Sequence, residues 1–136
     1  MDMSITDTAT ILGGIAAVAG FCFGLWEFRR KTDLKLFRTY TEKYNQIITP
    51  EMHDRWNRAC NSNDPKDWKD LDHVAIAFFN LVWEEIYLHR AGLLRDNIWK
   101  IWKPEIESVL QTDFAEVMME KHQFTFLKTE LKTGLR

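Results

Sequence analysis

A stretch of uncharged residues near the N-terminus sets the strongest limit on how this chain can fold. Residues 8–26 contain no Asp, Glu, Lys or Arg. As a helix these 19 residues would be about 28 Å long, close to the roughly 30 Å hydrocarbon core of a bilayer. Arg29, Arg30 and Lys31 follow, and basic residues beside a membrane helix stay on the cytoplasmic side. We therefore predict one transmembrane helix with its N-terminus outside, its C-terminal domain in the cytoplasm, and the three basic side chains at the lipid headgroups.

Two other interpretations of residues 8–26 are less favoured. A cleaved signal peptide has basic residues before its apolar core, whereas this chain has only the acids Asp2 and Asp7 there. A buried helix of a soluble domain is the second alternative, because four Gly and four Ala make the stretch only moderately hydrophobic.

Small residues recur at every fourth position of this stretch, at Ala16, Gly20 and Gly24. Small side chains at that spacing allow two membrane helices to approach closely. We therefore expect the chain to self-associate through this face. The alternative is that these residues are incidental, because Gly and Ala are common in membrane helices.

Charge is divided unevenly along the chain. Residues 1–28 contain three acids and no base, whereas the remaining 108 of the 136 residues contain 18 bases and 17 acids. This nearly neutral C-terminal part argues against a nucleic-acid partner, which usually requires a basic surface. The length allows one modest domain and one appendage. We therefore divide the chain into an anchor segment, residues 1–30, and a cytoplasmic domain, residues 31–136.

The domain carries the apolar spacing of helices, and no segment alternates like a strand. The helical pattern continues from the anchor to residue 48 without Pro or Gly, and Thr49 with Pro50 predicts the start of a second helix. Residues 74–83 hold a single polar side chain and predict the central helix of the core. Gly92 is the expected C-cap of that helix.

The rest of the chain predicts three further helices. Asp96 and Asp113 are the expected N-caps of two of them, and the third covers residues 126–131. Pro104 predicts a break or kink, and residues 61–69 predict a mobile loop. We therefore expect an all-α fold, an N-terminal transmembrane helix followed by a compact bundle of about five helices.

Few residues of the domain suggest a chemical reaction. The four histidines and two cysteines are scattered, so we expect no metal site and no disulfide. Glu85 and His89 are four residues apart and could share a metal, but such pairs are more often surface contacts. No serine lies in a Gly-rich elbow, and no glycine loop for phosphate is present. We therefore expect no cofactor and no enzymatic activity.

Asn80 and Glu84 form the most unusual polar feature of the predicted central helix. They are four residues apart and therefore share one side of the helix. If that side is buried, Glu84 requires a cation, for which Arg38, Arg55 and Arg58 are candidates. We favour a buried polar pair over a solvated stripe and over a ligand-binding or catalytic site.

Trp99 and Trp102 are three residues apart, beside Lys100 and Lys103. We favour a role for both tryptophans in helix packing within the core. The alternative is an exposed surface that contacts a partner or rests on the membrane.

Two short motifs carry a resemblance to known sequences, residues 79–85, FNLVWEE, and residues 92–96, GLLRD. With the N-terminal helix and its basic stop, the chain resembles a family of uncharacterised bacterial single-pass membrane proteins with a small cytoplasmic helical domain. This resemblance implies the same architecture, a bacterial or phage source and a place in the inner (cytoplasmic) membrane. The family has no assigned reaction, so it implies no catalytic residue.

These observations predict a non-enzymatic, membrane-anchored helical module that binds a protein partner at the cytoplasmic face and forms a homo-oligomer. Its expected partners are membrane lipid, a second copy of the chain and an unidentified protein. One alternative is a membrane-disrupting effector, toxin-like or defensive, that assembles through its transmembrane helix. Another is an enzyme that uses Glu84 and a histidine.

Overall fold

The structure, a computed structural model, describes the backbone of residues 5–133 and the side chains of residues 17–133. Within residues 5–133 every regular element is helical and no strand occurs. The predicted all-α class is therefore confirmed. Contacts divide the chain into two units, Met1–Lys35 and Leu36–Arg136, and each is described by itself below.

The described part of the first unit belongs to helix α1, which covers Ile5–Ile47 without interruption. Large apolar side chains along it are exposed, among them Val18, Phe21 and Phe23. Among the residues that the structure describes, no helix has both the length and the apolar character needed to cross a membrane. The predicted anchor covers residues 8–26, and the side chains of its first half, residues 8–16, lie outside the described part.

The second unit begins with the end of α1 and contains the other helices. Thr49 is the N-cap of α2 and Pro50 its first residue, as predicted. Proline has no N–H, and it is tolerated at this position because the first N–H groups of a helix have no acceptor within the helix. The elements after α1 are α2 (Pro50–Asn61), the short 3₁₀-helix η1 (Pro65–Trp68), α3 (Asp72–Arg90), α4 (Asp96–Leu110), α5 (Asp113–Lys121) and α6 (Phe126–Thr133).

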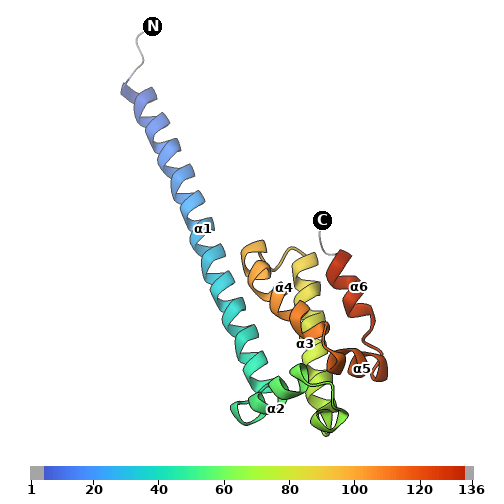
Figure 1. The fold of residues 1–136 in the computed structure, drawn as a ribbon. Helices are drawn as coiled ribbons and strands as arrows, with labels where there is room; N and C mark the ends of the chain where they lie inside the picture. Colours follow the sequence, from blue (N-terminus) through green and yellow to red (C-terminus); the bar gives the residue numbers. More distant parts are fainter. Residues whose placement is uncertain (1–4, 134–136) are drawn as a thin grey trace. The chain divides into compact units, whose positions relative to one another are not determined.

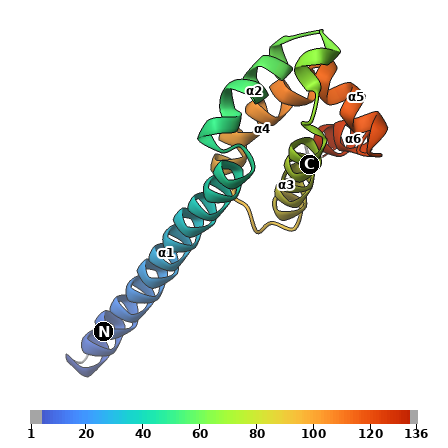
Figure 2. The same cartoon turned by 90° about the horizontal axis from the view of Figure 1, so that it is seen from below.

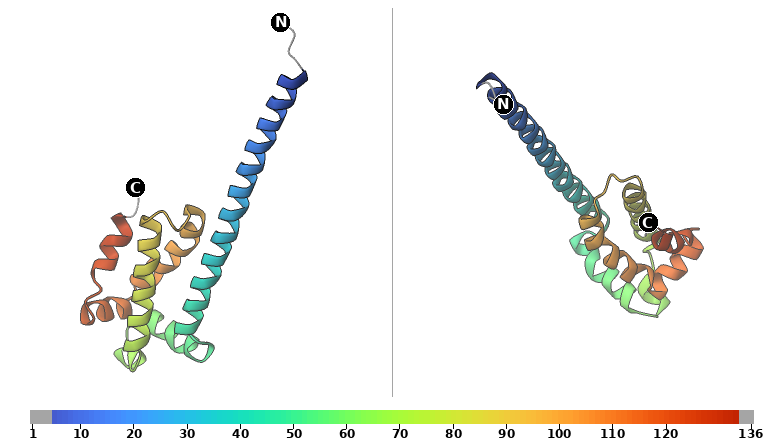
Figure 3. Two further views of the ribbon diagram at one scale, coloured as in Figure 1. Left: turned by 180° about the vertical axis from the view of Figure 1, so that it is seen from behind. Right: turned by 90° about the horizontal axis from the view of Figure 1, so that it is seen from above.

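Helix α3 is the centre of this unit, as its apolar sequence predicted. It contacts α4, α5 and α6, while α2 contacts η1 and α5. Figure 1 and the left view of Figure 3 show α4 on one side of α3 and α6 on the other. Figure 2 shows the green segment of α2 and η1 leading toward α5. A helix that is apolar on nearly every face requires such cover on several sides.

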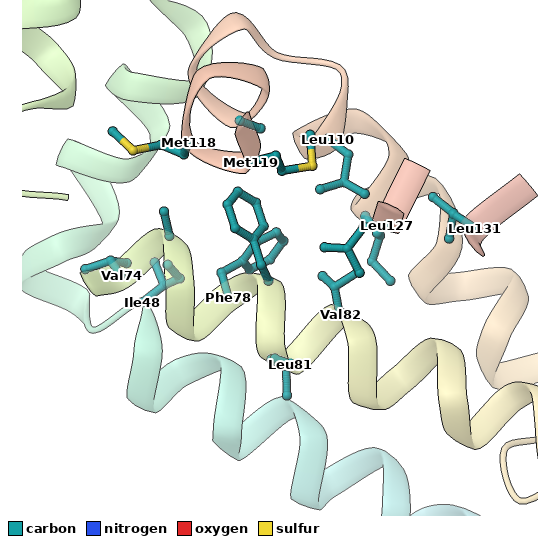
Figure 4. Packing of buried hydrophobic residues seen from close by; sticks show 14 of the residues in the cluster. Ile48, Val74, Phe78, Leu81, Val82, Leu110, Met118, Met119, Leu127 and Leu131 are labelled. Carbon is teal, nitrogen blue, oxygen red and sulfur yellow. The ribbon is translucent and has the colours of Figure 1, made fainter. Parts of the chain in front are cut away.

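Opposite faces of α3 serve different parts of the core. Figure 4 shows Phe78 and Val82 on the side that faces Met119 of α5 and Leu127 of α6. Leu81 points the other way, toward the second half of α1. Leu81 borders a cavity described below, and the Phe78 ring also forms part of its wall.

Helices α3 and α5 end in the same backbone motif. After α3 the N–H of Leu93 donates to the carbonyl of Leu88, and Gly92 has a φ of 70°. After α5 the N–H of Phe124 donates to the carbonyl of Met119, and Gln123 has a φ of 64°. Both are Schellman motifs, in which the left-handed residue normally is glycine. The C-cap of α3 is therefore Ala91, one residue before the predicted one, and Gly92 is the left-handed residue that follows it.

Several predicted helix ends are wrong by a small margin. The N-caps of α4 and α5 are Arg95 and Thr112, each one residue before the predicted aspartate, and the Thr112 hydroxyl accepts a hydrogen bond from the N–H of Ala115. Pro104 lies inside α4, which continues through it. The predicted loop of residues 61–69 contains η1, whose Trp68 is buried.

Candidate functional site

A charged cluster joins the second half of α1 to α3. The Lys43 Nζ lies 2.6 Å from the Glu84 Oε2, and the Tyr40 hydroxyl donates to the same oxygen at 3.1 Å. The hydrogen bond from Lys43 lowers the pKa of Glu84, and its Coulombic attraction adds to the effect. In turn, burial raises the pKa of Tyr40, and its bond to Glu84 adds to the rise. The Lys43 Nζ also lies 4.7 Å from the centroid of the Tyr40 ring.

The predicted burial of Asn80 and Glu84 is wrong. Asn80 is exposed, and the side chain of Glu84 is 49% exposed. The cation that pairs with Glu84 is Lys43, whereas Arg38 pairs with Glu42 and the predicted arginines form no ion pair with Glu84 in the described residues. The pair therefore belongs to the solvated side of α3, which was one of the alternatives.

The buried carboxyl is that of the next residue, Glu85, which is 7% exposed. Removal from water raises the pKa of Glu85 to about 8, the charges of Glu84 and Glu105 add to the rise, and Lys43 opposes it. Among the residues that the structure describes, none forms a hydrogen bond or ion pair with this carboxyl. A buried carboxyl in this position is mostly protonated at neutral pH.

Glu85 lines a cavity of about 300 Å³. The cavity lies between the second half of α1, α3 and α4, all within the second unit. Its charged lining consists of Glu85 and Glu105, and in the described residues no lysine, arginine or histidine lines it. Aliphatic side chains fill part of the wall, and the aromatic part consists of Phe37, Tyr40, Tyr44, Phe78 and Trp102.

The aromatic rings of the cavity form two groups. On one side the Trp102 ring stacks on Phe37 with centroids 5.8 Å apart and lies 5.6 Å from Tyr40. On the other side Tyr44 meets the edge of Phe78 at 6.4 Å. Both groups include rings from α1, which supplies Phe37, Tyr40 and Tyr44 at the spacing of one helical face. The sequence predicted a continuous helical pattern through these residues, but it did not predict that they would border a cavity.

Trp99 and Trp102 are both buried, which agrees with the predicted packing role and not with the alternative of an exposed surface. Trp99 stacks on His89 with ring centroids 4.6 Å apart. Trp102 packs against Phe37 and Tyr40 and forms part of the cavity wall.

Two of the four histidines, His89 and His122, pair with aspartates. His89 Nε2 is 3.2 Å from Asp96 Oδ1, and His122 Nε2 is 2.7 Å from Asp72 Oδ1. Within the described residues no histidine forms a hydrogen bond or ion pair with Glu84, so the geometry gives no support to an enzyme that uses Glu84 with a histidine. The described residues also hold no group of three His, Cys, Asp or Glu side chains that could bind a metal.

The remaining predicted residues lie in the first unit. Gly20 and Gly24 are helical, and a Cβ built on either would meet no atom within 4 Å. The side chain of Ala16 lies outside the described residues. Arg29, Arg30 and Lys31 are exposed, with Lys31 Nζ 2.8 Å from Glu27 Oε1.

The arrangement around Glu85 is suited to binding and lacks the parts of a reactive centre. One buried carboxyl and a set of aromatic rings surround an open volume, and no nucleophile with an adjacent base lines it. The sulfur atoms give no other candidate, because Cys22 and Cys60 are free and burial raises the pKa of the Cys60 thiol to about 11. No protein-family model matches the chain, and comparisons with curated proteins and with solved structures give no significant match.

Proposed function

We propose that this chain is a membrane-anchored helical binding module, with residues 8–26 as its transmembrane segment and the second unit at the cytoplasmic face of a bacterial inner membrane. The observation that carries the proposal is the exposure of large apolar side chains around α1. Val18, Phe21, Phe23, Leu25, Trp26 and Phe28 are all more than two-fifths exposed.

These side chains are spread around the helix and do not form one stripe. At 100° per residue, Val18, Phe23 and Phe28 project in widely different directions. A helix that packs on a water-soluble core needs only one apolar face, whereas a helix surrounded by lipid is apolar on all sides. The basic residues Arg29 to Lys31 follow this segment and support the proposed orientation.

Each of the two units of the module has its own proposed partners. The anchor would contact lipid and, through Ala16, Gly20 and Gly24, a second copy of the chain, because glycines leave a helix surface on which another helix can lie closely. The second unit would bind a cytoplasmic partner, and anchoring would raise the concentration of that partner at the membrane.

Membrane fractionation of the full chain tests the anchor. The double variant Val18→Asp, Phe21→Asp places two acids in the middle of the proposed segment, where each costs about 2.5 to 3.5 kcal/mol of insertion free energy. We expect the wild-type chain to stay in the membrane pellet after alkaline carbonate extraction and the variant to leave it.

The matched control introduces the same two charges outside the proposed segment. Thr39→Asp with Gln46→Asp changes two exposed positions of α1 in the second unit and should leave the chain in the pellet. Extraction of the wild-type chain by carbonate, or retention of the Val18 and Phe21 double variant, would contradict the proposal.

A further inference from the structure

We propose that the cavity between α1, α3 and α4 binds a small organic ammonium ion, with Glu85 as its counter-ion. This inference concerns the second unit alone and does not depend on the anchor. It starts from Glu85, a residue that is 7% exposed and lines an open volume, and whose carboxyl has no hydrogen-bond or ion-pair partner among the described residues. Because no group of the described chain pairs with it, this carboxyl is available to a cation that enters the cavity.

The aromatic wall suits a cation with methyl or methylene groups. On one side of the cavity the Trp102 ring contacts both Phe37 and Tyr40, with centroid distances of 5.8 and 5.6 Å. The negative faces of such rings attract ammonium groups, and quaternary ammonium ions are bound in this way. The Tyr40 ring already has one ammonium near it, the Lys43 Nζ at 4.7 Å from the centroid.

The charges of the cavity select against anions. Glu85 and Glu105 line it, and no basic side chain does so in the described part of the chain. A phosphate group placed beside the ammonium would therefore meet two carboxyls, because Lys43, the base that acts on Glu85, is already paired with Glu84. For this reason we assign the site to a free ammonium compound and not to a phospholipid headgroup.

The volume sets the size of the ligand. A cavity of about 300 Å³ is at the lower end of the range for small-molecule sites. A ligand fills only part of this volume, because its atoms stay at van der Waals distance from the wall. The cavity therefore suits an ammonium compound of a few carbon atoms. Choline is a fitting probe, and 3,3-dimethyl-1-butanol is its neutral counterpart of the same shape.

Isothermal titration calorimetry of the full chain in a maltoside detergent, which contains no ammonium group, tests the proposal. Above the pKa of Glu85, we expect choline to bind at least about tenfold more tightly than 3,3-dimethyl-1-butanol, since only choline gains the ion pair and the cation–π contacts. Phosphocholine should bind more weakly than choline.

Three variants identify the residues responsible. Glu85→Gln should lose the preference for choline over its neutral counterpart, and Glu105→Gln should reduce it by a smaller factor. Glu107→Gln is the matched control, because Glu107 is on the same helix α4 but pairs with Lys103 and does not line the cavity. It should bind choline as the wild-type chain does, and circular dichroism checks that all three variants fold.

Each other outcome contradicts the proposal. Equal binding of choline and 3,3-dimethyl-1-butanol would show a purely apolar cavity, and no saturable binding of choline would exclude the site. A folded Glu85→Gln variant that keeps the preference would remove Glu85 as the counter-ion. Phosphocholine binding as tightly as choline would replace the free ammonium compound by a lipid headgroup.

Discussion

At the scale of single residues, neighbouring glutamates of α3 lie in opposite environments. Glu84 is half exposed and bonded to Lys43 and Tyr40, whereas Glu85 is buried beside an aromatic cavity. The two side chains differ by 100° around the helix, which is enough to place one in water and the other in the core. Their pKa values therefore move in opposite directions, down for Glu84 and up for Glu85.

Glu85 should make the stability of the fold depend on pH. Its pKa is raised from 4.5 to about 8, so the folded chain keeps a proton that the unfolded chain has lost. The stability contributed by this group is complete below pH 4.5 and is lost as the pH rises through 8. Three charged groups act on the pKa of Glu85: Glu84 and Glu105 raise it, and Lys43 lowers it. We expect Glu85→Gln to increase the free energy of unfolding by about 3 kcal/mol at pH 9 and by little at pH 5.

Thermal unfolding followed by circular dichroism at pH 5, 7 and 9 measures this effect. The Glu107→Gln variant, with a carboxyl whose side chain is 40% exposed, serves as the control and should follow the wild-type curve. If the Tm of Glu85→Gln and of the wild-type chain fall in parallel between pH 5 and pH 9, Glu85 is not the group that titrates.

The sequence identified the correct part of α3 but the wrong carboxyl. Residues 74–83 are apolar on nearly every face, so their spacing shows that the helix is central without showing which side faces which neighbour. Asn80, the single polar residue of that run, and Glu84 share one side of the helix, and the sequence favours burial of that side. Glu85 is buried instead because α1 and α4 cover its side of the helix, which is a matter of tertiary packing.

At the scale of helices and turns, the chain uses one C-terminal motif with two different residues. Gly92 and Gln123 both occupy the left-handed conformation that follows a helix. Glycine adopts it without a steric penalty, whereas a side chain brings its Cβ close to the following carbonyl. The sequence predicted the turn at Gly92 from the glycine itself. It gave no comparable sign at Gln123, because glutamine has no preference for this conformation.

Replacing Gln123 by glycine should therefore stabilise the fold. We expect Gln123→Gly to increase the free energy of unfolding by about 1 kcal/mol, which raises the Tm of a domain of this size by a few degrees. Gln111 offers a matched control, because it follows α4 in the right-handed region with a φ of −88°. Gln111→Gly should lower the Tm, since glycine there only adds freedom to the unfolded chain. A change of the same sign in both variants would argue against relief of strain at Gln123.

Other features of the elements were local enough to be predicted. Thr49 and Pro50 mark the start of α2 in the sequence and in the structure. The predicted break at Pro104 is wrong, since α4 continues through it while Trp102 and Ile106 on either side remain buried, and the alternative of a kink stays a prediction. Burial of the apolar face of a helix stabilises the fold by more free energy than the loss of one backbone hydrogen bond costs.

At the scale of the whole molecule, the two units were predicted with different success. The helical character of the second unit follows from its sequence, because each helix carries its own apolar pattern. The cavity does not, because its walls come from three helices and its volume is what remains after they pack. The self-association and the anchor of the first unit stay predictions, and both are open to direct measurement.

Self-association is best tested at Gly20 and Gly24. Because a Cβ at either position meets no atom within 4 Å, larger side chains there should not disturb the fold of a single chain. We expect Gly20→Leu with Gly24→Leu to convert the oligomer into a monomer in mild detergent, as measured by light scattering after gel filtration, with the Tm unchanged. Cys22→Leu, on the opposite side of the helix, should leave the oligomer intact. Oligomers of equal size in all three chains would exclude pairing through these glycines.

The unpaired carboxyl of Glu85 also has a consequence for how sequences of this kind change over generations. Selection for heat resistance alone would favour a neutral residue of similar size at position 85, since such a residue avoids the cost of ionising a buried carboxyl. A lineage that retains an acid at this position keeps a less stable protein, together with a carboxyl that can pair with a cation in the cavity. Retention of an acid at position 85 in related sequences would thus indicate that the cavity binds a cation, independently of any binding measurement on this chain.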